Sequence, residues 1–296
     1  MLATEQLPIR LDGGVATELE QAGLTVAPPW WSTRALLTEQ KRRVLRGVHA
    51  DYLASGAQLI TANTFRCNVR ALRAVGRIDG AGLAWMVHAA VGVARAARSE
   101  VGSAALIAGS LAPAEDCYRP DLVPTDDELR DEHGWLAAEL VRAGVDVILI
   151  ETMNSEREAR IALEQVLACG GRGWVSFVCG SGGRLLSGEP AAAAASAVEA
   201  DGADAVLVNC TSLGDTEDAL RRIRDTCGGP IGAYPNIEDR PHTYRNGRRA
   251  VATTPEEFAA VLGRWHDELD AALLGGCCGA GPPHIAALRD RLDGAA

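Results

Sequence analysis

The stretch "TDDELRDEHGWLAAELVRAGVDVILIETM", Thr125 to Met153, decides the fold of this chain. Its first part, Thr125 to Gly144, opens on a threonine followed by acidic residues, carries apolar side chains at helical spacing and closes on a glycine. These are the signs of a capped amphipathic helix. The second part, Asp146 to Met153, is a compact apolar run typical of a strand buried on both faces. The stretch therefore predicts one helix followed by one strand.

The same unit recurs along the chain. "TEQKRRVLRGVHADYLASG" and "TPEEFAAVLGRWHDELD" are further helical stretches, each lying between apolar runs. We expect strands at Ile9–Gly14, Gln58–Phe65, Ala105–Leu111, Asp146–Met153, Gly173–Cys179, Ala205–Cys210, Pro230–Asn236 and Ala271–Cys278. Eight alternations of strand and helix predict an α/β fold of the (β/α)₈ TIM-barrel type, with an open doubly wound sheet as the alternative.

Length and composition place the chain among globular proteins. It has 296 residues, of which 47% are hydrophobic and 23% charged, and no Pro/Gly/Ser-rich linker divides it. We therefore expect one domain over residues 1–296. The formal net charge of −10 argues against a nucleic-acid partner, and we interpret the basic cluster "RNGRR" at Arg245–Arg249 as a solvated loop. The absence of a long apolar run or a signal-peptide pattern predicts a cytoplasmic protein without a membrane partner.

Polar residues stand where the predicted strands end. Because the carboxyl ends of barrel strands converge on one mouth, we expect these side chains to form the functional site. They are Asp12, Asn63, Glu151, Asn209, Cys210, Asn236, Cys277 and Cys278.

Three of these residues are cysteines, and two are adjacent. Cys277 and Cys278 lie in "GGCCG", which admits a vicinal disulfide, two incidental small hydrophobic residues or two ligands of a soft metal. Glycine permits the backbone bend that would let both thiols reach one ion. Cys210 ends another strand and brings a third thiol to the same mouth, which favours a metal site. Three thiolates suit zinc and leave a fourth coordination position open.

The remaining cysteines and the histidines are expected to lie outside the metal site. Small buried thiols are common in protein cores, and a lone helical histidine is more often structural than a ligand. The cysteines are Cys67, Cys117, Cys169, Cys179 and Cys227, and the histidines are His49, His88, His133, His266 and His284. His242, in a predicted loop, is left undecided.

Five motifs, in this order along the chain, carry a family resemblance. They are "LDGGVATELE" (Leu11–Glu20), "ITANTF" (Ile60–Phe65), "ET" (Glu151–Thr152), "NC" (Asn209–Cys210) and "GGCCG" (Gly275–Gly279) followed by "PPHI". Together they resemble the homocysteine S-methyltransferase family over essentially the whole chain. The resemblance implies a zinc-dependent barrel that transfers a methyl group to the thiol of homocysteine, giving methionine, with zinc on Cys210, Cys277 and Cys278.

The resemblance also implies where homocysteine binds. Residues matching Asp12, Gly13, Gly14 and Glu151 surround homocysteine in the family, and their chemistry suits this role. A carboxylate can pair with the substrate ammonium, and glycine lets the backbone approach a ligand closely. Asp12 as a simple turn residue and Glu151 as an internal ion-pair partner are the structural alternatives. Asn63 and Asn236 are expected to orient loops or substrate.

The methyl donor is expected to be a small sulfonium compound, S-methylmethionine or S-adenosylmethionine, because the chain has no length left for folate or corrinoid domains. Betaine is disfavoured, since Arg66 stands where the betaine-using branch carries an aromatic residue and a quaternary ammonium prefers aromatic faces. Selenohomocysteine or another small thiol is an alternative acceptor. Two other functions stay open: a barrel subunit that takes methyl from a separate corrinoid protein, and a non-catalytic zinc-binding or redox barrel.

Overall fold

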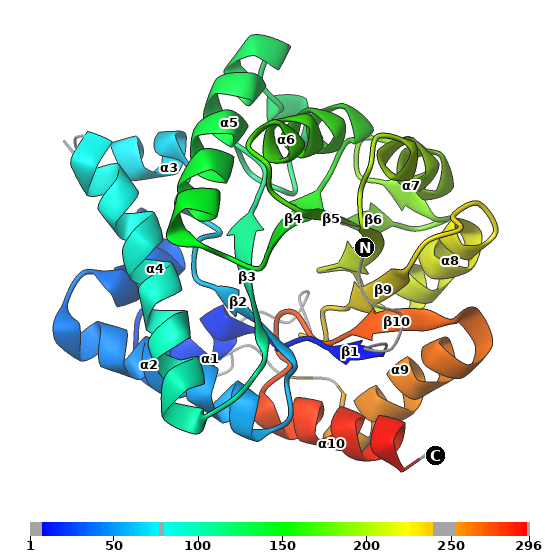
Figure 1. The fold of residues 1–296 in the computed structure, drawn as a ribbon. Coiled ribbons are helices and arrows are strands. Elements are labelled where there is room, and N and C mark those ends of the chain that lie inside the picture. The colour runs from blue at the N-terminus through cyan, green and yellow to red at the C-terminus, as the bar shows by residue number, and fades with distance from the viewer. Residues whose placement is uncertain (1–7, 77–79, 239–250, 252, 295–296) are drawn as a thin grey trace.

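Eight parallel strands form a single sheet in the structure, a computed structural model that describes residues 8–294 except 77–79, 239–250 and 252. The sheet order is β1-β10-β9-β8-β5-β4-β3-β2, and a bridge between Leu11 and Leu59 joins its two edges into a nearly closed barrel (Figure 1). The predicted (β/α)₈ barrel is confirmed. The strands are β1 (Ile9–Arg10), β2 (Leu59–Ala62), β3 (Leu106–Leu111), β4 (Val147–Met153), β5 (Gly173–Phe177), β8 (Ala205–Asn209), β9 (Ile231–Tyr234) and β10 (Ala271–Leu274).

Helices surround the barrel (Figure 1). They are α1 (Val15–Gln21), α2 (Glu39–Ala54), α3 (Val69–Ala74), α4 (Gly80–Val101), α5 (Asp126–Ala143), α6 (Glu156–Ala168), α7 (Ala191–Ala200), α8 (Leu213–Arg224), α9 (Pro255–Leu269) and α10 (Pro282–Asp293). Two short 3₁₀ helices, η2 (Trp31–Leu36) and η3 (Pro120–Leu122), lie in the loops after β1 and β3.

Helix ends follow the caps that the sequence contains. At the start of α9, the Thr254 hydroxyl accepts a hydrogen bond from the Glu257 N–H at 3.2 Å, and the Glu257 carboxylate accepts one from the Thr254 N–H at 2.9 Å. This capping box satisfies two backbone donors that a helix N-terminus leaves open. At the end of α5, Gly144 adopts φ 75°, which only glycine enters without strain.

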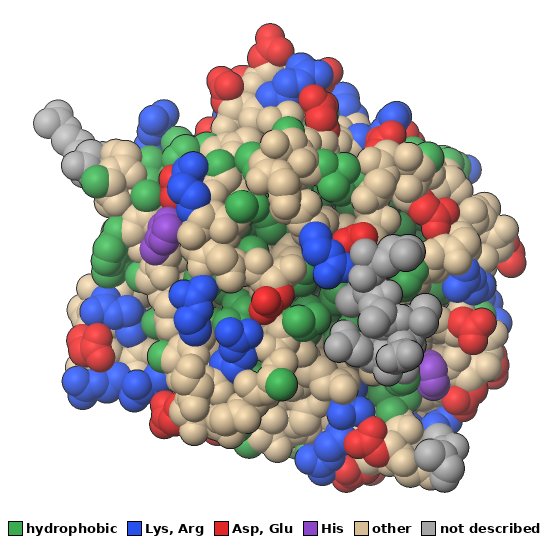
Figure 2. All heavy atoms as spheres, in the orientation of Figure 1, with side chains coloured by type: hydrophobic (Ala, Val, Ile, Leu, Met, Phe, Trp, Pro, Cys, Tyr) green, Lys and Arg blue, Asp and Glu red, His purple; other side chains and the backbone are tan. Residues whose placement is uncertain are grey.

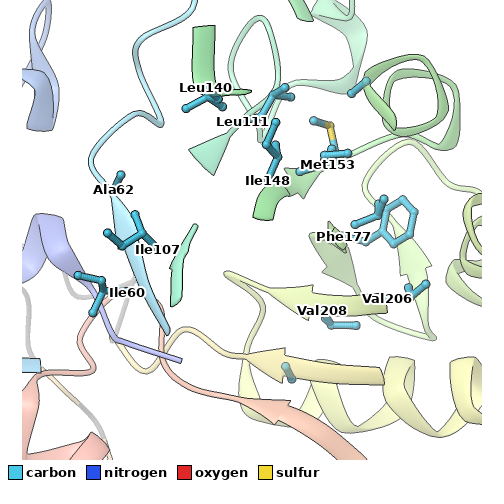
Figure 3. Close-up of a cluster of buried hydrophobic side chains, with 14 of the residues drawn as sticks. Ile60, Ala62, Ile107, Leu111, Leu140, Ile148, Met153, Phe177, Val206 and Val208 are labelled. Carbon is cyan, nitrogen blue, oxygen red and sulfur yellow. The ribbon is translucent and has the colours of Figure 1, made fainter. Parts of the chain in front are cut away.

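Each central strand buries both of its faces, which explains the continuous apolar runs in the sequence. Ile60, Ile107, Ile148 and Val206 belong to the cluster between strands and helices that Figure 3 shows. The residues that alternate with these along the strands point to the other face and fill the barrel interior: Leu59, Val147, Leu149, Trp174 and Leu207. Because side chains alternate along a strand, one sheet contributes to two hydrophobic cores, one inside the barrel and one between the strands and the helices.

The predicted strands extend beyond the observed ones at several mouth ends. β1 ends at Arg10 instead of Gly14, and β10 ends at Leu274 instead of Cys278. The intervening backbone still hydrogen-bonds between segments, because the Gly276 N–H donates to the Asp12 carbonyl at 2.9 Å, but it leaves the regular ladder. A two-stranded hairpin of β6 (Cys179–Gly180) and β7 (Arg184–Leu185) was not predicted, because strands of two residues leave no periodic pattern.

Charged side chains of both signs interleave on the face that Figure 2 shows. Among the described residues, every helix is too short or too polar to cross a bilayer. The predictions for His242 and for Arg245–Arg249 concern positions outside the described residues.

Candidate active site

A cavity of about 530 Å³ opens at the carboxyl ends of the strands. Its lining includes eight of the ten site residues that the sequence analysis names: Asp12, Gly13, Gly14, Asn63, Glu151, Cys210, Cys277 and Cys278. Asn209 and Asn236 are not among the described lining residues. The volume lies in the range of small-molecule sites, so the mouth of this barrel has room for a substrate.

Three thiols meet at one side of the cavity. Cys210 follows β8, and Cys277 and Cys278 follow β10, yet their sulfur atoms all lie within 4.8 Å of one another. In this structure Cys210 and Cys277 form a disulfide, with their Cα atoms 5.7 Å apart, whereas the Sγ atoms of Cys277 and Cys278 are 3.9 Å apart. The disulfide differs from the thiols that we expected, and it crosses from one strand end to another instead of joining the adjacent pair. Proximity that suits a shared metal also permits this bond.

The cysteine pair lies in a tight turn beyond β10. The Ala280 N–H donates to the Cys277 carbonyl at 3.2 Å, and Gly279 has φ 86°. The bend therefore depends on Gly279, whereas the preceding glycines serve close packing. A Cβ on Gly275 would lie 2.6 Å from the Leu11 Cβ. Glycine permits the turn as predicted, but at the position after the cysteines.

A left-handed backbone also positions Cys210. Its φ is 49°, and Thr152 at the end of β4 has φ 60°, both uncommon for residues with a side chain. The Asn209 amide connects the two: its Oδ1 accepts from the Thr152 N–H at 2.9 Å and its Nδ2 donates to the Thr152 Oγ1 at 2.8 Å. Ser176 Oγ donates to the same Oδ1 at 2.7 Å. Of this network, the sequence indicated only Asn209, as a polar strand end.

Asp12 is buried at the cavity wall. Its carboxylate accepts hydrogen bonds from the Thr61 N–H at 2.7 Å and the Thr61 hydroxyl at 3.0 Å. Burial raises the pKa of Asp12 to about 7, against the opposing effect of these two bonds. Asp12 is thus more than a turn residue, because its side chain is held inside the cavity by the neighbouring strand.

Glu151 is the second buried carboxylate of the cavity. Its Oε1 accepts a hydrogen bond from the Ser110 hydroxyl, and its Oε2 accepts one from the Tyr234 hydroxyl at 3.3 Å. Burial raises the pKa of Glu151 to about 7, and the charge of Asp12 adds to the rise. Within the described residues neither carboxylate has a Lys or Arg partner, so Glu151 is not an internal ion-pair member. Two buried acids without a cation suit a cationic ligand group.

Gly13 and Gly14 hold the end of β1 against the cysteine turn. The Gly14 N–H donates to the Ala280 carbonyl at 2.9 Å, and a Cβ on Gly14 would lie 2.7 Å from the Cys277 carbonyl oxygen. A Cβ on Gly13 would collide with the Ala280 carbonyl. Both glycines line the cavity, and both are required by contact with the protein's own backbone.

The two asparagines make loop contacts. Asn63 Nδ2 donates to the Ser32 carbonyl at 2.9 Å and so ties the end of β2 to η2. Asn236 Oδ1 accepts from the Glu238 N–H at 3.1 Å, within its own turn. Asn63 reaches the cavity lining while it orients a loop, whereas the Asn236 side chain stabilises the chain after β9.

The other cysteines and the histidines lie apart from the three-thiol cluster within the described residues. Burial raises the pKa of both Cys67 and Cys179 to about 12, which makes them unreactive thiols. Cys117 is buried in the loop after β3 and contributes to the cavity lining. His133 Nε2 lies 3.0 Å from Glu158 Oε1, and both side chains are buried and absent from the described cavity lining.

Comparison with known proteins gives one consistent result. The family model described as homocysteine S-methyltransferase matches residues 9–292. The homocysteine S-methyltransferase YbgG of Bacillus subtilis is 30% identical, over 94% of this chain and 92% of its own length. Selenocysteine Se-methyltransferase of Brassica oleracea is 29% identical, over 95% of this chain and 88% of its own length. The metallated homocysteine methyltransferase MmuM of Escherichia coli superposes with a TM-score of 0.81 at 28% identity and covers 96% of both chains, and its oxidized form also reaches 0.81.

Proposed function

The chain belongs to the homocysteine S-methyltransferase family, and on that premise we propose that it moves a methyl group from a sulfonium donor to homocysteine, giving methionine, with the help of zinc. The observation that carries the proposal is the meeting of three cysteine sulfurs within 4.8 Å beside two buried carboxylates. Homocysteine carries a thiol at one end and an ammonium group at the other. The cysteine sulfurs can hold a metal that binds the thiol, and the carboxylates can pair with the ammonium group.

The donor set fits zinc. Cys210, Cys277 and Cys278 are the residues that would hold the ion once the Cys210–Cys277 disulfide is reduced, because cysteine ligates a metal as a thiolate. When bound, zinc lowers the pKa of the acceptor thiol from its ordinary value of about 8.5, so that the sulfur is a thiolate at neutral pH. A cytoplasmic location suits this site, because reducing conditions there keep the cysteines as thiols.

Asp12 and Glu151 bind the ammonium group of homocysteine. Each is fixed by neighbouring hydroxyl or N–H donors, so the position of the charge is set before the substrate arrives. The incoming ammonium favours the ionised form of both acids, whose pKa burial has raised to about 7. Held at this end, homocysteine points its thiol toward the three cysteines.

Methyl transfer then needs an aligned donor. The thiol of homocysteine releases its proton to solvent, and its sulfur forms a bond to the methyl carbon. The bond from that carbon to the sulfonium sulfur breaks, and the electron pair stays on the departing thioether. The protein contributes by positioning the two substrates, because alignment of the two sulfur atoms and the methyl carbon removes much of the entropic barrier.

The charge of the cavity favours a cationic donor. Five carboxylates are among its described lining residues: Asp12, Glu20, Asp116, Glu151 and Glu238. Such a surface attracts a positively charged sulfonium and disfavours an anionic methyl donor. S-Methylmethionine and S-adenosylmethionine are the two candidates.

A turnover screen tests the proposal. The reduced, zinc-loaded protein is incubated with homocysteine, selenohomocysteine or cysteine against each of S-methylmethionine, S-adenosylmethionine and betaine, and methylated products are measured by mass spectrometry. Methionine from a sulfonium donor is the expected result. Product that forms only after a methylated corrinoid protein is added would overturn it, as would stoichiometric zinc binding without any methylated product.

A further inference from the structure

Arg66 is the one Lys or Arg among the described residues that line the cavity. It follows Phe65 in the loop after β2, at the outer part of the mouth, where Trp31 and Tyr118 are 38% and 40% exposed. The inner part holds Asp12 and Glu151, which are 4% and 8% exposed. The cavity thus has an inner acidic end and an outer end that carries a single cation.

Two aromatic rings hold the guanidinium in place. Its carbon lies 5.7 Å from the centroid of the Trp31 ring and 5.4 Å from that of Phe65. A ring stacks against the flat face of a guanidinium. The N–H groups point outward in the plane of the guanidinium, so they can still donate hydrogen bonds. Arg66 is therefore oriented by residues that do not use its hydrogen-bonding capacity.

Those donors are almost unused within the described part of the chain. The hydrogen bond that Arg66 makes there is a long one, 3.5 Å, to the Glu115 carbonyl, and no described carboxylate forms an ion pair with it. The Glu115 side chain instead pairs with Arg70 at 2.8 Å. A cation left without a carboxylate in a cavity lined by acids is suited to an anionic group on a ligand.

The substrates of the proposed reaction carry that group. The inner end of the barrel is closed by the interior core, so homocysteine at Asp12, Glu151 and the cysteines leaves only the outer end for the donor. S-Methylmethionine and S-adenosylmethionine both carry a carboxylate besides the sulfonium. A guanidinium and a carboxylate match as two parallel N–H···O bonds.

We propose that Arg66 binds the carboxylate of the methyl donor and selects sulfonium compounds that carry one. This inference rests on the proposed function, and it assigns the residue that selects the donor at that site. Arg66 also covers a face of Trp31 and of Phe65, so a quaternary ammonium group cannot use those faces while the guanidinium is there.

The test compares S-methylmethionine with its amide, in which a neutral group of similar size replaces the carboxylate. Both are assayed with homocysteine and the full-length, reduced, zinc-loaded protein. We expect the wild type to prefer the carboxylate by about tenfold or more in kcat/KM, the range of a charge-assisted hydrogen bond. Arg66→Gln removes this preference by raising KM for S-methylmethionine, while its kcat/KM for the amide changes much less.

Two further variants keep the test decisive. Arg66→Lys retains the charge without the planar fork, so we expect an intermediate preference. Arg73→Gln removes an exposed arginine of α3 and should behave as the wild type. Zinc content and melting temperature confirm that each variant is folded.

The outcomes separate the two proposals. A wild type that uses S-methylmethionine and its amide equally well, or an Arg66→Gln variant that loses both equally, overturns the role of Arg66 and leaves the methyltransferase proposal standing. A wild type that methylates homocysteine from no sulfonium donor overturns both.

Discussion

Asn209 and Thr152 exchange two hydrogen bonds through one side-chain amide, at 2.9 and 2.8 Å, across the ends of β8 and β4. Thr152 directly follows Glu151, and Asn209 directly precedes Cys210. One amide thus holds together the backbone positions next to a substrate-binding candidate and next to a metal-ligand candidate. Both Thr152 and Cys210 are in the left-handed region, where such external support is needed.

Replacing this amide tests its positioning role. In Asn209→Leu, the Thr152 N–H and the Ser176 hydroxyl lose a buried acceptor, which costs about 1–3 kcal/mol of stability per unsatisfied group. We expect a lower zinc affinity and a lower kcat, with the larger loss in kcat. Asn209→Asp keeps the acceptor and should retain more of both. Wild-type zinc affinity and kcat in a folded Asn209→Leu protein would contradict the role.

Removing one thiol tests the metal site. We expect the reduced wild type to bind one zinc per chain and Cys210→Ser to lose most of that zinc in the presence of a competing chelator, because a hydroxyl is a poor zinc ligand. Elemental analysis after gel filtration measures the content. Cys169→Ser, at the end of α6 and outside the three-thiol cluster, is the matched control. Equal zinc in Cys210→Ser and wild type would rule out this ligand set.

Glu151→Gln tests the ammonium site. The substitution keeps the size of the side chain and its contact with Ser110 but removes the charge that would pair with homocysteine. We expect the dissociation constant for homocysteine to rise about tenfold or more, with zinc content unchanged. Calorimetric titration of the zinc-loaded protein gives the affinity. Loss of zinc together with homocysteine binding would instead assign Glu151 to the integrity of the site.

Glu151 also predicts a pH dependence of stability. Its pKa rises from 4.5 to about 7 on folding, because burial disfavours the charged carboxylate. Below pH 4.5 the carboxyl is protonated in both states and contributes nothing. Between pH 4.5 and about 7 the unfolded chain releases this proton and the folded chain retains it, so stability falls as pH rises and levels off above about 7, by roughly 3 kcal/mol.

Glu151→Gln should abolish this part of the pH profile. In urea unfolding of the reduced, metal-free protein, the variant should gain stability relative to the wild type between pH 5 and pH 8. Glu164→Gln, on the exposed face of α6, is the control and should follow the wild type at both pH values. A constant difference between Glu151→Gln and wild type across this range would show that the carboxyl is ionised in the folded protein.

The fold and the thiol cluster could be predicted because both depend on order along the chain. Eight apolar runs alternating with capped helices permit few topologies, and the carboxyl ends of parallel strands meet whatever the loops do. The positions of Cys210, Cys277 and Cys278 at predicted strand ends are thus enough to predict that these three residues lie close together. The disulfide that the structure shows between Cys210 and Cys277 could not be predicted, because it depends on the orientation of two side chains.

Other features depend on contacts that no local pattern contains. The sequence singles out Arg66 only as an argument against betaine, and its position beside Trp31 comes from the structure, because Trp31 lies in a loop that follows a different strand. Gly13 and Gly14 are predicted as positions where the backbone approaches a ligand closely, and the structure adds that both also pack against the chain's own backbone. Asn236 carries the same amide as Asn209 at the end of a neighbouring strand, but it serves its own turn. Whether an asparagine at a strand end stabilises the site depends on which residues lie opposite its side chain across the barrel.

The contact between the end of β1 and the turn after β10 determines when the site can form. Gly14 and Ala280 hydrogen-bond to each other, as do Gly276 and Asp12, so the first and last strands of the barrel meet at the proposed centre. A chain emerging from the ribosome holds Asp12 and Cys210 long before Cys277 and Cys278 exist. The proposed metal site is therefore completed only after β10 and the turn that follows it have been synthesised, and a nascent chain that stops before β10 contains a single one of the three thiols.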